Sequence, residues 1–271
     1  MRYAVVSDIH SNLEALTAVL ERIDNEAPDR IICLGDVVGY YANPNECVKI
    51  MRQRNVQCIG GNHDRAAAGF KTPSYFSDPA RRAIKWTRRH LTADNLRFLQ
   101  TLPLLETIDQ RFLAVHGALH PAPNGDVYLS SHSTILESFE ALIRKARKVR
   151  LCFFGHTHRP AVYQYMDGRV RTLNQEEVTL APGAYYLVNP GSVGQSRDLD
   201  PRGSFLIFDA NEGIVRFHRV AYDSAACYQK ARQTGLLGNE PALCKSSNGI
   251  VASIKNAKRS LREWSMHFLG G

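Results

Sequence analysis

Residues 3–10 read Tyr-Ala-Val-Val-Ser-Asp-Ile-His, an apolar run that leads directly into an aspartate and a histidine. A short apolar run of this kind is typical of a fully buried strand. The same order, an apolar run followed by a polar motif, recurs four more times along the chain. The five motifs are Asp8-Ile9-His10, Gly35-Asp36-Val37-Val38-Gly39, Gly61-Asn62-His63-Asp64, Val115-His116-Gly117 and Gly155-His156-Thr157-His158. Because ligands of open α/β sheets collect beyond the carboxyl ends of the strands, these five loops are predicted to meet at one edge of a sheet.

The first sixty residues have a βαβαβ pattern. Buried strands are predicted over residues 3–7, 31–34 and 56–59. A helix is expected after the first strand, where Ser11 and Glu14 have the spacing of a capping box. A second helix is expected after Asn43, since Pro44 suits its first position. This pattern predicts a parallel sheet with right-handed crossovers in this half of the chain.

The rest of the chain changes character twice. Residues 66–103 predict two helices, starting near Ser77 and Thr92, that leave the sheet and could lie beside the site as a partial lid. Further strands are predicted over residues 112–115, 151–154, 162–165, 169–173, 184–188, 204–209 and 214–220, and further helices over 135–146 and 223–234. The period of two after residue 160 predicts an antiparallel or mixed sheet packed on the first. A polar, basic tail follows from Lys245.

Composition limits the class of protein. The 271 residues include 34 basic and 26 acidic ones, so the net charge of +8 favours anionic ligands. Two basic runs, at 81–89 and 144–150, are interpreted as solvated helix faces in preference to a nucleic-acid patch. The six cysteines form no CxxC pair, no signal peptide precedes Tyr3, and no apolar run approaches the ~20 residues of a membrane helix. We therefore expect a reduced, cytoplasmic protein with no membrane partner.

The five motifs carry the chemistry of a metal site. Carboxylate and amide oxygens combined with imidazoles suit divalent metals such as manganese, iron, nickel and zinc. Each motif alone has a structural alternative, since a Gly-Asp pair is mostly a turn and a single histidine is mostly a surface or satisfied core residue. The order of all five, each at a strand end, favours a site that holds a pair of metals and attacks a phosphate ester.

In these motifs the chain resembles the calcineurin-like metallophosphoesterases, and more closely their small bacterial phosphodiesterase branch. The resemblance runs from Asp8 to about Ser192, where it ends in Asn189-Pro190-Gly191-Ser192. It implies an α/β fold in which a two-sheet β-sandwich is flanked by helices, in four αββα layers. Residues 1–222 would form the catalytic domain, with 66–103 as its lid-like helical insertion, and 223–271 would form a C-terminal helix and basic tail.

The resemblance also implies the roles of the motif residues. One metal would be held by Asp8, His10, Asp36 and His158, and the other by Asp36, Asn62, His116 and His156. Asp36 would bridge the two divalent ions, with manganese favoured, and a hydroxide bound by both would be the nucleophile. His63 would not bind metal but would act near the leaving-group oxygen, as a general acid or a donor. Asp64 would either orient His63 or cap the following helix.

The implied activity is the hydrolysis of phosphodiesters or of small phosphate esters, a class that includes nucleotides. A protein phosphatase is less favoured, because Val37-Val38 stands where those enzymes have an Asp-Arg pair. A nuclease is supported only by the basic runs, and a non-catalytic scaffold has no need for a complete ligand set. Tyr40 and Arg197 follow motif segments and are either substrate contacts or ordinary surface side chains, while Arg159 is expected to be structural or exposed. The substrate itself and the oligomeric state stay open.

Overall fold

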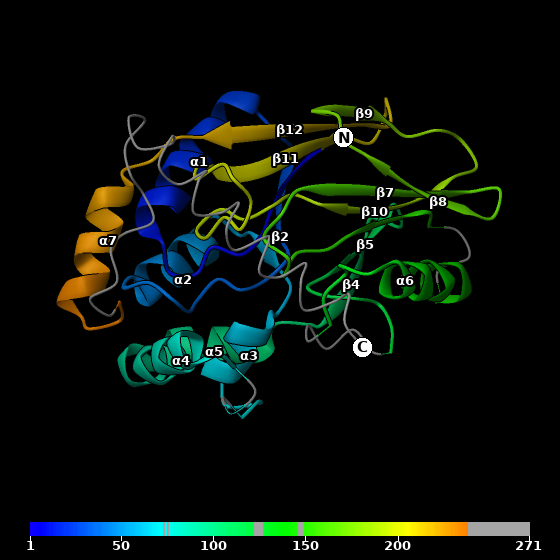
Figure 1. Cartoon of the computed structure of the whole chain (residues 1–271). Helices are drawn as coiled ribbons and strands as arrows, with labels where there is room; N and C mark the ends of the chain where they lie inside the picture. Colours follow the sequence, from blue (N-terminus) through cyan, green and yellow to red (C-terminus); the bar gives the residue numbers. More distant parts are fainter. Residues whose placement is uncertain (73, 75, 122–126, 146–148, 238–271) are drawn as a thin grey trace, which may run out of the picture. The chain divides into compact units, whose positions relative to one another are not determined.

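Two six-stranded sheets pack face to face between helices (Figure 1). The first sheet has the order β3-β2-β1-β11-β12-β9, with β1 Arg2–Val6, β2 Arg30–Cys33, β3 Gln57–Cys58, β9 Glu177–Thr179, β11 Gly203–Asp209 and β12 Ile214–Val220. The second has the order β4-β5-β6-β10-β7-β8, with β4 Leu105–Ile108, β5 Phe112–Val115, β6 Leu151–Phe153, β7 Ala161–Met166, β8 Arg169–Leu173 and β10 Tyr185–Asn189. The helices are α1 Leu13–Glu26, α2 Pro44–Gln53, α3 Asn62–Ala67, α4 Asp78–His90, α5 Ala93–Thr101, α6 His132–Lys145 and α7 Ser224–Gln233.

This computed structural model describes residues 1–72, 74, 76–121, 127–145 and 149–237. Within that range, the chain from Met1 to Leu237 forms one compact unit. The basic tail predicted from Lys245 lies outside the described residues, and the predicted boundary between residues 222 and 223 stays a prediction. No helix of the described part has both the length and the apolar character needed to cross a bilayer.

The predicted fold class is confirmed, but the predicted division of the strands between the sheets is wrong. Strands β1, β2 and β3 are parallel, as expected from the βαβαβ pattern. The late strands β11 and β12 do not join the second sheet, because β11 pairs antiparallel with β1 and β12 pairs with β11. A buried strand such as β11 needs hydrogen-bonding partners on both edges, and its period of two does not reveal which strand supplies them.

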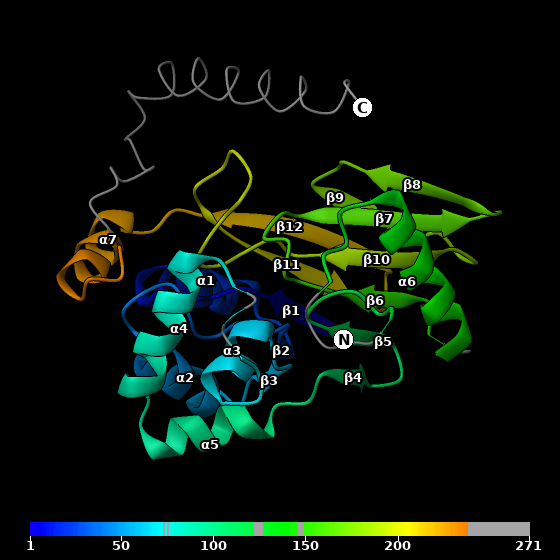
Figure 2. The ribbon, with the colours of Figure 1, turned by 60° about the horizontal axis from the view of Figure 1, so that its bottom comes forward.

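The alternation of side chains along the strands builds the layers. On β1, Ala4 and Val6 face the outer core beneath α1 and α2, whereas Tyr3 and Val5 face the core between the sheets. Figure 2 shows α6 on the other side of the molecule, where Phe139 and Leu142 pack on the outer face of the second sheet. This is the four-layer order of helices, sheet, sheet and helix, and it leaves the carboxyl ends of several strands on one edge.

The first helix corrects one detail of the sequence prediction. Asn12, not Ser11, is the N-cap of α1, and its side chain accepts a hydrogen bond from the backbone N–H of Ala15. Ser11 has a left-handed backbone (φ 60°), and its hydroxyl accepts from the N–H of Gly39 instead. The Ser11 side chain therefore joins the first and second motif loops, and it is not available to cap the helix.

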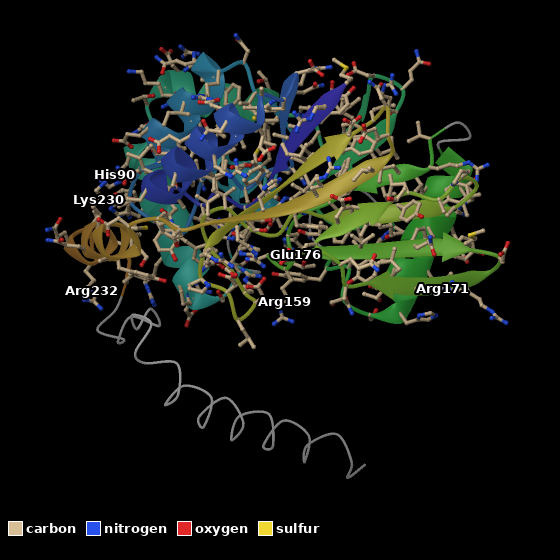
Figure 3. All side chains as sticks on the ribbon, turned by 90° about the horizontal axis from the view of Figure 1, so that it is seen from above. His90, Arg159, Arg171, Glu176, Lys230 and Arg232 are labelled. Carbon is tan, nitrogen blue, oxygen red and sulfur yellow. The ribbon has the colours of Figure 1, made fainter. Side chains whose placement is uncertain are left out.

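The peripheral helices follow the predicted patterns. The helices predicted near Ser77 and Thr92 are α4 and α5, and both pack against α2 and α3. The basic run at 81–89 lies on α4, whose Ala83 and Ile84 are buried while most of its basic residues face solvent. At the other end of the described chain, Lys230 of α7, labelled in Figure 3, pairs with Glu14 of α1 at 2.5 Å.

Candidate metal centre

The structure gathers all seven predicted ligands at one edge of the two sheets. They are Asp8 after β1, Asp36 after β2, Asn62 at the first position of α3, His116 after β5, and His156 and His158 after β6, together with His10. All seven are buried. Five of them, Asp8, His10, Asp36, His156 and His158, have left-handed φ values between 54° and 66°. Such backbone strain persists only where the surrounding structure imposes it, and it is concentrated at functional sites.

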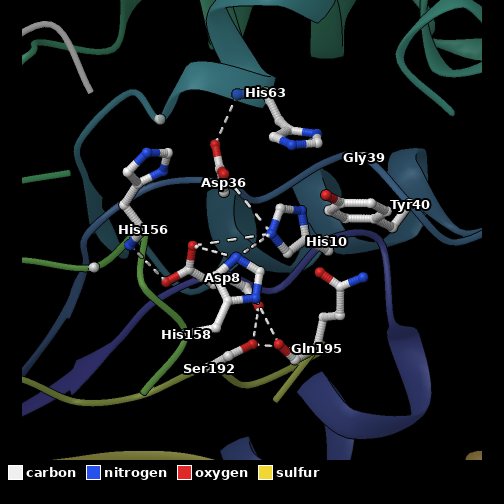
Figure 4. A network of polar contacts seen from close by, with 12 residues as sticks. Asp8, His10, Asp36, Gly39, Tyr40, His63, His156, His158, Ser192 and Gln195 are labelled. Atoms are coloured by element: carbon white, nitrogen blue, oxygen red, sulfur yellow. Dashed lines mark hydrogen bonds and ion pairs between the residues drawn. The ribbon is translucent and has the colours of Figure 1, made fainter. Parts of the chain in front are cut away.

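Backbone carbonyl groups orient three of the imidazoles (Figure 4 draws His10 and His158). Nδ1 of His116 lies 2.8 Å from the oxygen of Leu34, Nδ1 of His158 lies 2.5 Å from the oxygen of Gln195, and Nδ1 of His10 lies 3.2 Å from the oxygen of Val38. Because a carbonyl oxygen only accepts, each Nδ1 is the donor. The Nε2 atom of each ring therefore faces the centre of the site, the arrangement usual for metal-binding histidines.

Asp36 lies between two groups of possible ligands. One group consists of Asp8, His10, Asp36 and His158, the other consists of Asp36, His116 and His156, and the donor atoms within each group lie within 4.8 Å of one another. Oδ2 of Asp36 is 3.7 Å from Nε2 of His10 and 3.2 Å from Nε2 of His116. The amide oxygen of Asn62 joins the second group, since Oδ1 lies 3.1 Å from Nε2 of His116.

Several buried atoms of this site lack the partner that burial normally requires. Among the described residues, Oδ1 of Asp8 and Nε2 of His156 have no hydrogen-bond partner. Nε2 of His10 lies 3.1 Å from Nε2 of His158, and in the neutral rings both atoms are acceptors because both Nδ1 atoms donate. Lone pairs that face one another in a buried pocket are stabilised by a cation between them, so the residues present fit divalent metal ions.

Burial and mutual charge shift the pKa values of these groups. Burial lowers the pKa of His10, His156 and His158 well below the usual value, which keeps these rings neutral. Burial also raises the pKa of Asp8 to about 7. For His116 burial acts in the opposite direction, but the carboxylates of Asp36 and Asp8 outweigh it and raise the pKa to about 10. Of these four histidines, His116 is therefore the one that is protonated near pH 7, and it faces the carboxyl groups of Asp36 and Asp8.

His63 does not belong to either group of ligands. Its ring packs edge-on against His10, with centroids 4.8 Å apart, and against Phe76 at 5.0 Å. Its backbone N–H donates to Oδ1 of Asp36 at 2.8 Å, whereas its own Nδ1 has no partner among the described residues. Burial lowers the pKa of His63 to about 4, so the ring is neutral near pH 7.

Among the described residues, the Asp64 carboxylate bonds backbone N–H groups and not the ring of His63. Its Oδ2 accepts from the N–H of Gly61 at 3.1 Å, which caps α3, and its Oδ1 accepts from the N–H of Val38 at 3.0 Å. Of the two predicted alternatives, the cap is the one observed. The second bond was not predicted, and it fastens the Asp36 loop to the start of α3.

The segment Asn189-Pro190-Gly191-Ser192 supports the site from behind. The Ser192 hydroxyl donates to the backbone oxygen of Asp8 at 2.8 Å, and the Asn189 side chain donates to the oxygen of Gly155 at 2.7 Å. These bonds tie the loops after β1 and β6 to the end of β10. The segment therefore holds the two loops together next to the possible ligands, and the Ser192 hydroxyl is engaged in this support.

A cavity of about 610 Å³ opens beside the ligands. It is lined by Tyr40, Asn62, His63, Lys71, Phe76, Ser77, Ala80, Tyr128, His156 and Arg197. Phe76, Ser77 and Ala80 bring one end of the 66–103 segment beside the site, and the role of that segment as a lid stays a prediction.

Sequence patterns identified only part of this cavity wall. Tyr40 and Arg197, left open between substrate contact and surface, both line it. Lys71, Phe76 and Tyr128 carry no sequence signal, because they come from segments between the motifs. Arg159 is exposed (Figure 3), and its Nε donates to the backbone oxygen of Arg197 at 2.8 Å.

Comparison with known proteins identifies relatives over most of the chain. An uncharacterized protein of Methanocaldococcus jannaschii is 39% identical over 230 residues, which are 84% of this chain and 90% of the relative. The crystal structure of a metallophosphoesterase from Sphaerobacter thermophilus is 36% identical, has a TM-score of 0.73, and covers 88% of this chain and 95% of its own. A hypothetical protein from Pyrococcus horikoshii shares the fold, with a TM-score of 0.68 at 21% identity over 87% and 94% of the two chains.

The family assignment follows from the match over residues 1–213, which include every ligand described above. The family is described as the calcineurin-like phosphoesterase superfamily domain. The metallophosphoesterase from Sphaerobacter thermophilus has the same fold as this chain. The chain belongs to the calcineurin-like phosphoesterase superfamily.

Proposed function

We propose that the protein is a dinuclear metal-dependent phosphoesterase that hydrolyses phosphodiesters or small phosphate esters, including nucleotides. The observation that carries this proposal is that Asp36 belongs to both groups of buried ligands. Asp8, His10, Asp36 and His158 would hold one divalent ion. Asp36, Asn62, His116 and His156 would hold the other. Two carboxylates do not neutralise two dications, so the loaded site would attract a phosphate.

When bound, two divalent cations would supply positive charge at the phosphoryl oxygens. They would also lower the pKa of the water bound to them, so that hydroxide is available at neutral pH. The chain itself contributes rigid orientation. Carbonyl groups fix the rings of His10, His116 and His158, and the His63 N–H fixes Oδ1 of Asp36. Because the burial that lowers the pKa of His63 keeps it neutral, we assign its ring N–H as a donor to a phosphoryl or leaving-group oxygen.

The mixed ligand set does not discriminate among manganese, iron, nickel and zinc. Manganese is the ion to test first, because the family resemblance favours it. A cavity of about 610 Å³ suits a substrate of nucleotide size.

The five described cysteines are free and buried, which agrees with a reducing compartment, and we infer a cytoplasmic location.

A hydrolysis panel tests the proposal. Purified protein, loaded with manganese, is assayed on bis-nitrophenyl phosphate, nitrophenyl phosphate, cyclic nucleotides, dinucleoside polyphosphates, a phosphopeptide and a single-stranded oligonucleotide. We expect hydrolysis of the small esters, its loss on chelation, and two metal ions per chain by elemental analysis. Protein that retains no metal and cleaves none of the substrates would rule the function out, whereas preferred cleavage of the oligonucleotide would make the protein a nuclease.

A further inference from the structure

Arg197 lies at the wall of the cavity without a carboxylate partner. Its guanidinium contacts the hydroxyl of Tyr40 at 3.3 Å, the hydroxyl of Tyr128 at 3.4 Å and Oε1 of Gln195 at 3.5 Å. In the part of the chain that the structure describes, no aspartate or glutamate forms an ion pair with it. The next arginine of the same loop differs, because Arg202 pairs with Asp200 at 2.6 Å and is exposed.

The two tyrosines that hold Arg197 rest on the histidines of the site. The ring of Tyr40 lies 4.7 Å from that of His10 and 4.8 Å from that of His63. The ring of Tyr128 stacks on that of His156 at 3.8 Å, with an angle of 21° between the planes. Tyr40 and Tyr128 come from the loop after β2 and the segment before α6, so Arg197 joins two separate parts of the cavity wall.

The charge of Arg197 acts on the site. It lowers the pKa of Asp8, although burial dominates there and raises it, and it adds to the lowering of the pKa of His158 that burial causes. The Arg197 backbone N–H also donates to the oxygen of His158 at 3.3 Å, which fixes the start of the side chain beside a predicted ligand. A partly buried guanidinium without a counter-ion is costly, and a bound anion would compensate it.

We propose that Arg197 binds the phosphate of the substrate through oxygens that are not attacked, and that Tyr40 and Tyr128 are positioning residues that aim its guanidinium into the cavity. The proposal rests on the proposed phosphoesterase function. The planar guanidinium presents paired N–H donors that match two phosphate oxygens. Among the described residues, the guanidinium donates only to Tyr hydroxyls and an amide oxygen, so its remaining N–H groups are available to an anion in the cavity that it lines.

The test measures binding and turnover separately in manganese-loaded protein. Inorganic phosphate is titrated by calorimetry, and kcat and KM are determined for bis-nitrophenyl phosphate, with metal content and Tm recorded for every variant. Arg197→Gln is expected to weaken phosphate binding and to lower kcat/KM by about 10- to 100-fold, the scale of a lost charge-assisted hydrogen bond, with metal content unchanged. Arg197→Lys should recover part of the loss, since it keeps the charge but not the paired donors. Arg202→Gln, on the same loop but outside the cavity, is the matched control.

The tyrosines provide a second measurement. Tyr40→Phe and Tyr128→Phe should each weaken phosphate binding in the wild-type background but have little further effect beside Arg197→Gln, because they act through the arginine. If Arg197→Gln does not fold, these variants and Arg197→Lys decide the question. Phosphate affinity in Arg197→Gln equal to that in Arg202→Gln overturns the proposal, as does a wild-type protein that binds no phosphate. Phosphate binding that depends on Arg197 without hydrolysis of any ester would instead contradict the proposed function alone.

Discussion

The backbone N–H of His63 donates a 2.8 Å hydrogen bond to Oδ1 of Asp36. This bond occupies one carboxylate oxygen and leaves Oδ2 to face His10 on one side and His116 on the other. The third motif therefore positions the shared ligand of the second motif with its main chain, while its side chain lines the cavity. A single residue thus connects the predicted metal site to the predicted substrate site.

Replacing the shared carboxylate tests this connection. Asp36→Asn keeps an oxygen for the His63 N–H but offers an amide in place of Oδ2, and asparagine tolerates the left-handed φ of 54°. We expect at most one metal ion per chain by elemental analysis and a loss of activity of about 100-fold or more. Asp167→Asn is the matched control, since Asp167 is exposed in a turn with a φ of 52°. Two retained metal ions in Asp36→Asn would contradict the bridging role.

The role of His63 is tested by two replacements. His63→Ala should keep both metal ions and slow turnover by roughly 100-fold, the scale of a lost donor or acid. His63→Gln keeps an N–H group but cannot carry a proton at neutral pH. Turnover of the glutamine variant well above that of the alanine variant would support a donor, whereas equal loss would support a general acid. Metal loss in His63→Ala would place His63 among the ligands and refute both roles.

The space around His63 is set by Gly39. A Cβ at Gly39, where φ is 107°, would meet Nδ1 of His63, so a side chain here must displace the imidazole. Gly168 also has a positive φ, 74°, but a Cβ there would meet nothing within 4 Å. Gly168→Ala should lose about 1–2 kcal/mol of stability in denaturant unfolding, from the strained backbone. Gly39→Ala should lose more, because its Cβ must also displace the buried ring of His63. Only Gly39→Ala should lose turnover, and unchanged kcat in that variant would show that the His63 position is not critical.

The sequence predicts the site better than it predicts the sheets. The seven residues that the structure brings together were predicted as ligands because their motifs follow strands, and strand ends are positions that local sequence marks. The partner of β11 was not identified, because pairing with β1 depends on contacts about 200 residues apart along the chain. The start of the helix at Thr92 was predicted from its local sequence, and the Thr92 side chain caps that helix. The N-cap of α1 was not predicted correctly, because Asn12 caps the helix while the Ser11 hydroxyl accepts from the distant N–H of Gly39.

The cavity wall marks the limit of local sequence patterns. Arg197 follows a recognisable motif, but the position of its guanidinium depends on a contact with Tyr128. Tyr128 precedes α6 and belongs to no motif. The cavity exists only because the loops after β2 and β10 and the segments before α4 and α6 meet in space. The spacing of motifs along the chain does not predict these contacts between distant segments. The motifs therefore predict the possible metal ligands but not the substrate that the cavity accepts.

Metal binding should release protons, and the number should change with pH. The carboxylates around His116 raise its pKa to about 10 despite burial, and burial raises the pKa of Asp8 to about 7, so both groups carry protons at pH 6 in the metal-free protein. Ligands must be deprotonated to bind metal. Calorimetry in buffers of different ionisation enthalpy should therefore detect about two protons per chain at pH 6 and about one at pH 8 from these two groups, in addition to the proton released when a metal-bound water ionises, with affinity rising over this range.

The same shift sets the stability of the metal-free protein. Because burial raises the pKa of Asp8 from its usual 3.8 to about 7, its neutral form stabilises the fold at low pH, and this contribution is lost as the pH rises towards 7. Measured relative to Asp8→Asn, the Tm of metal-free wild-type protein should fall over that range, because the histidines whose pKa values burial lowers affect both proteins alike. The increase in Tm caused by manganese should grow over the same range. In Asp8→Asn, which cannot titrate, proton release at pH 6 should drop by about one per chain. Metal binding at pH 6 that releases no proton from the wild-type protein would show that these ligands are already deprotonated.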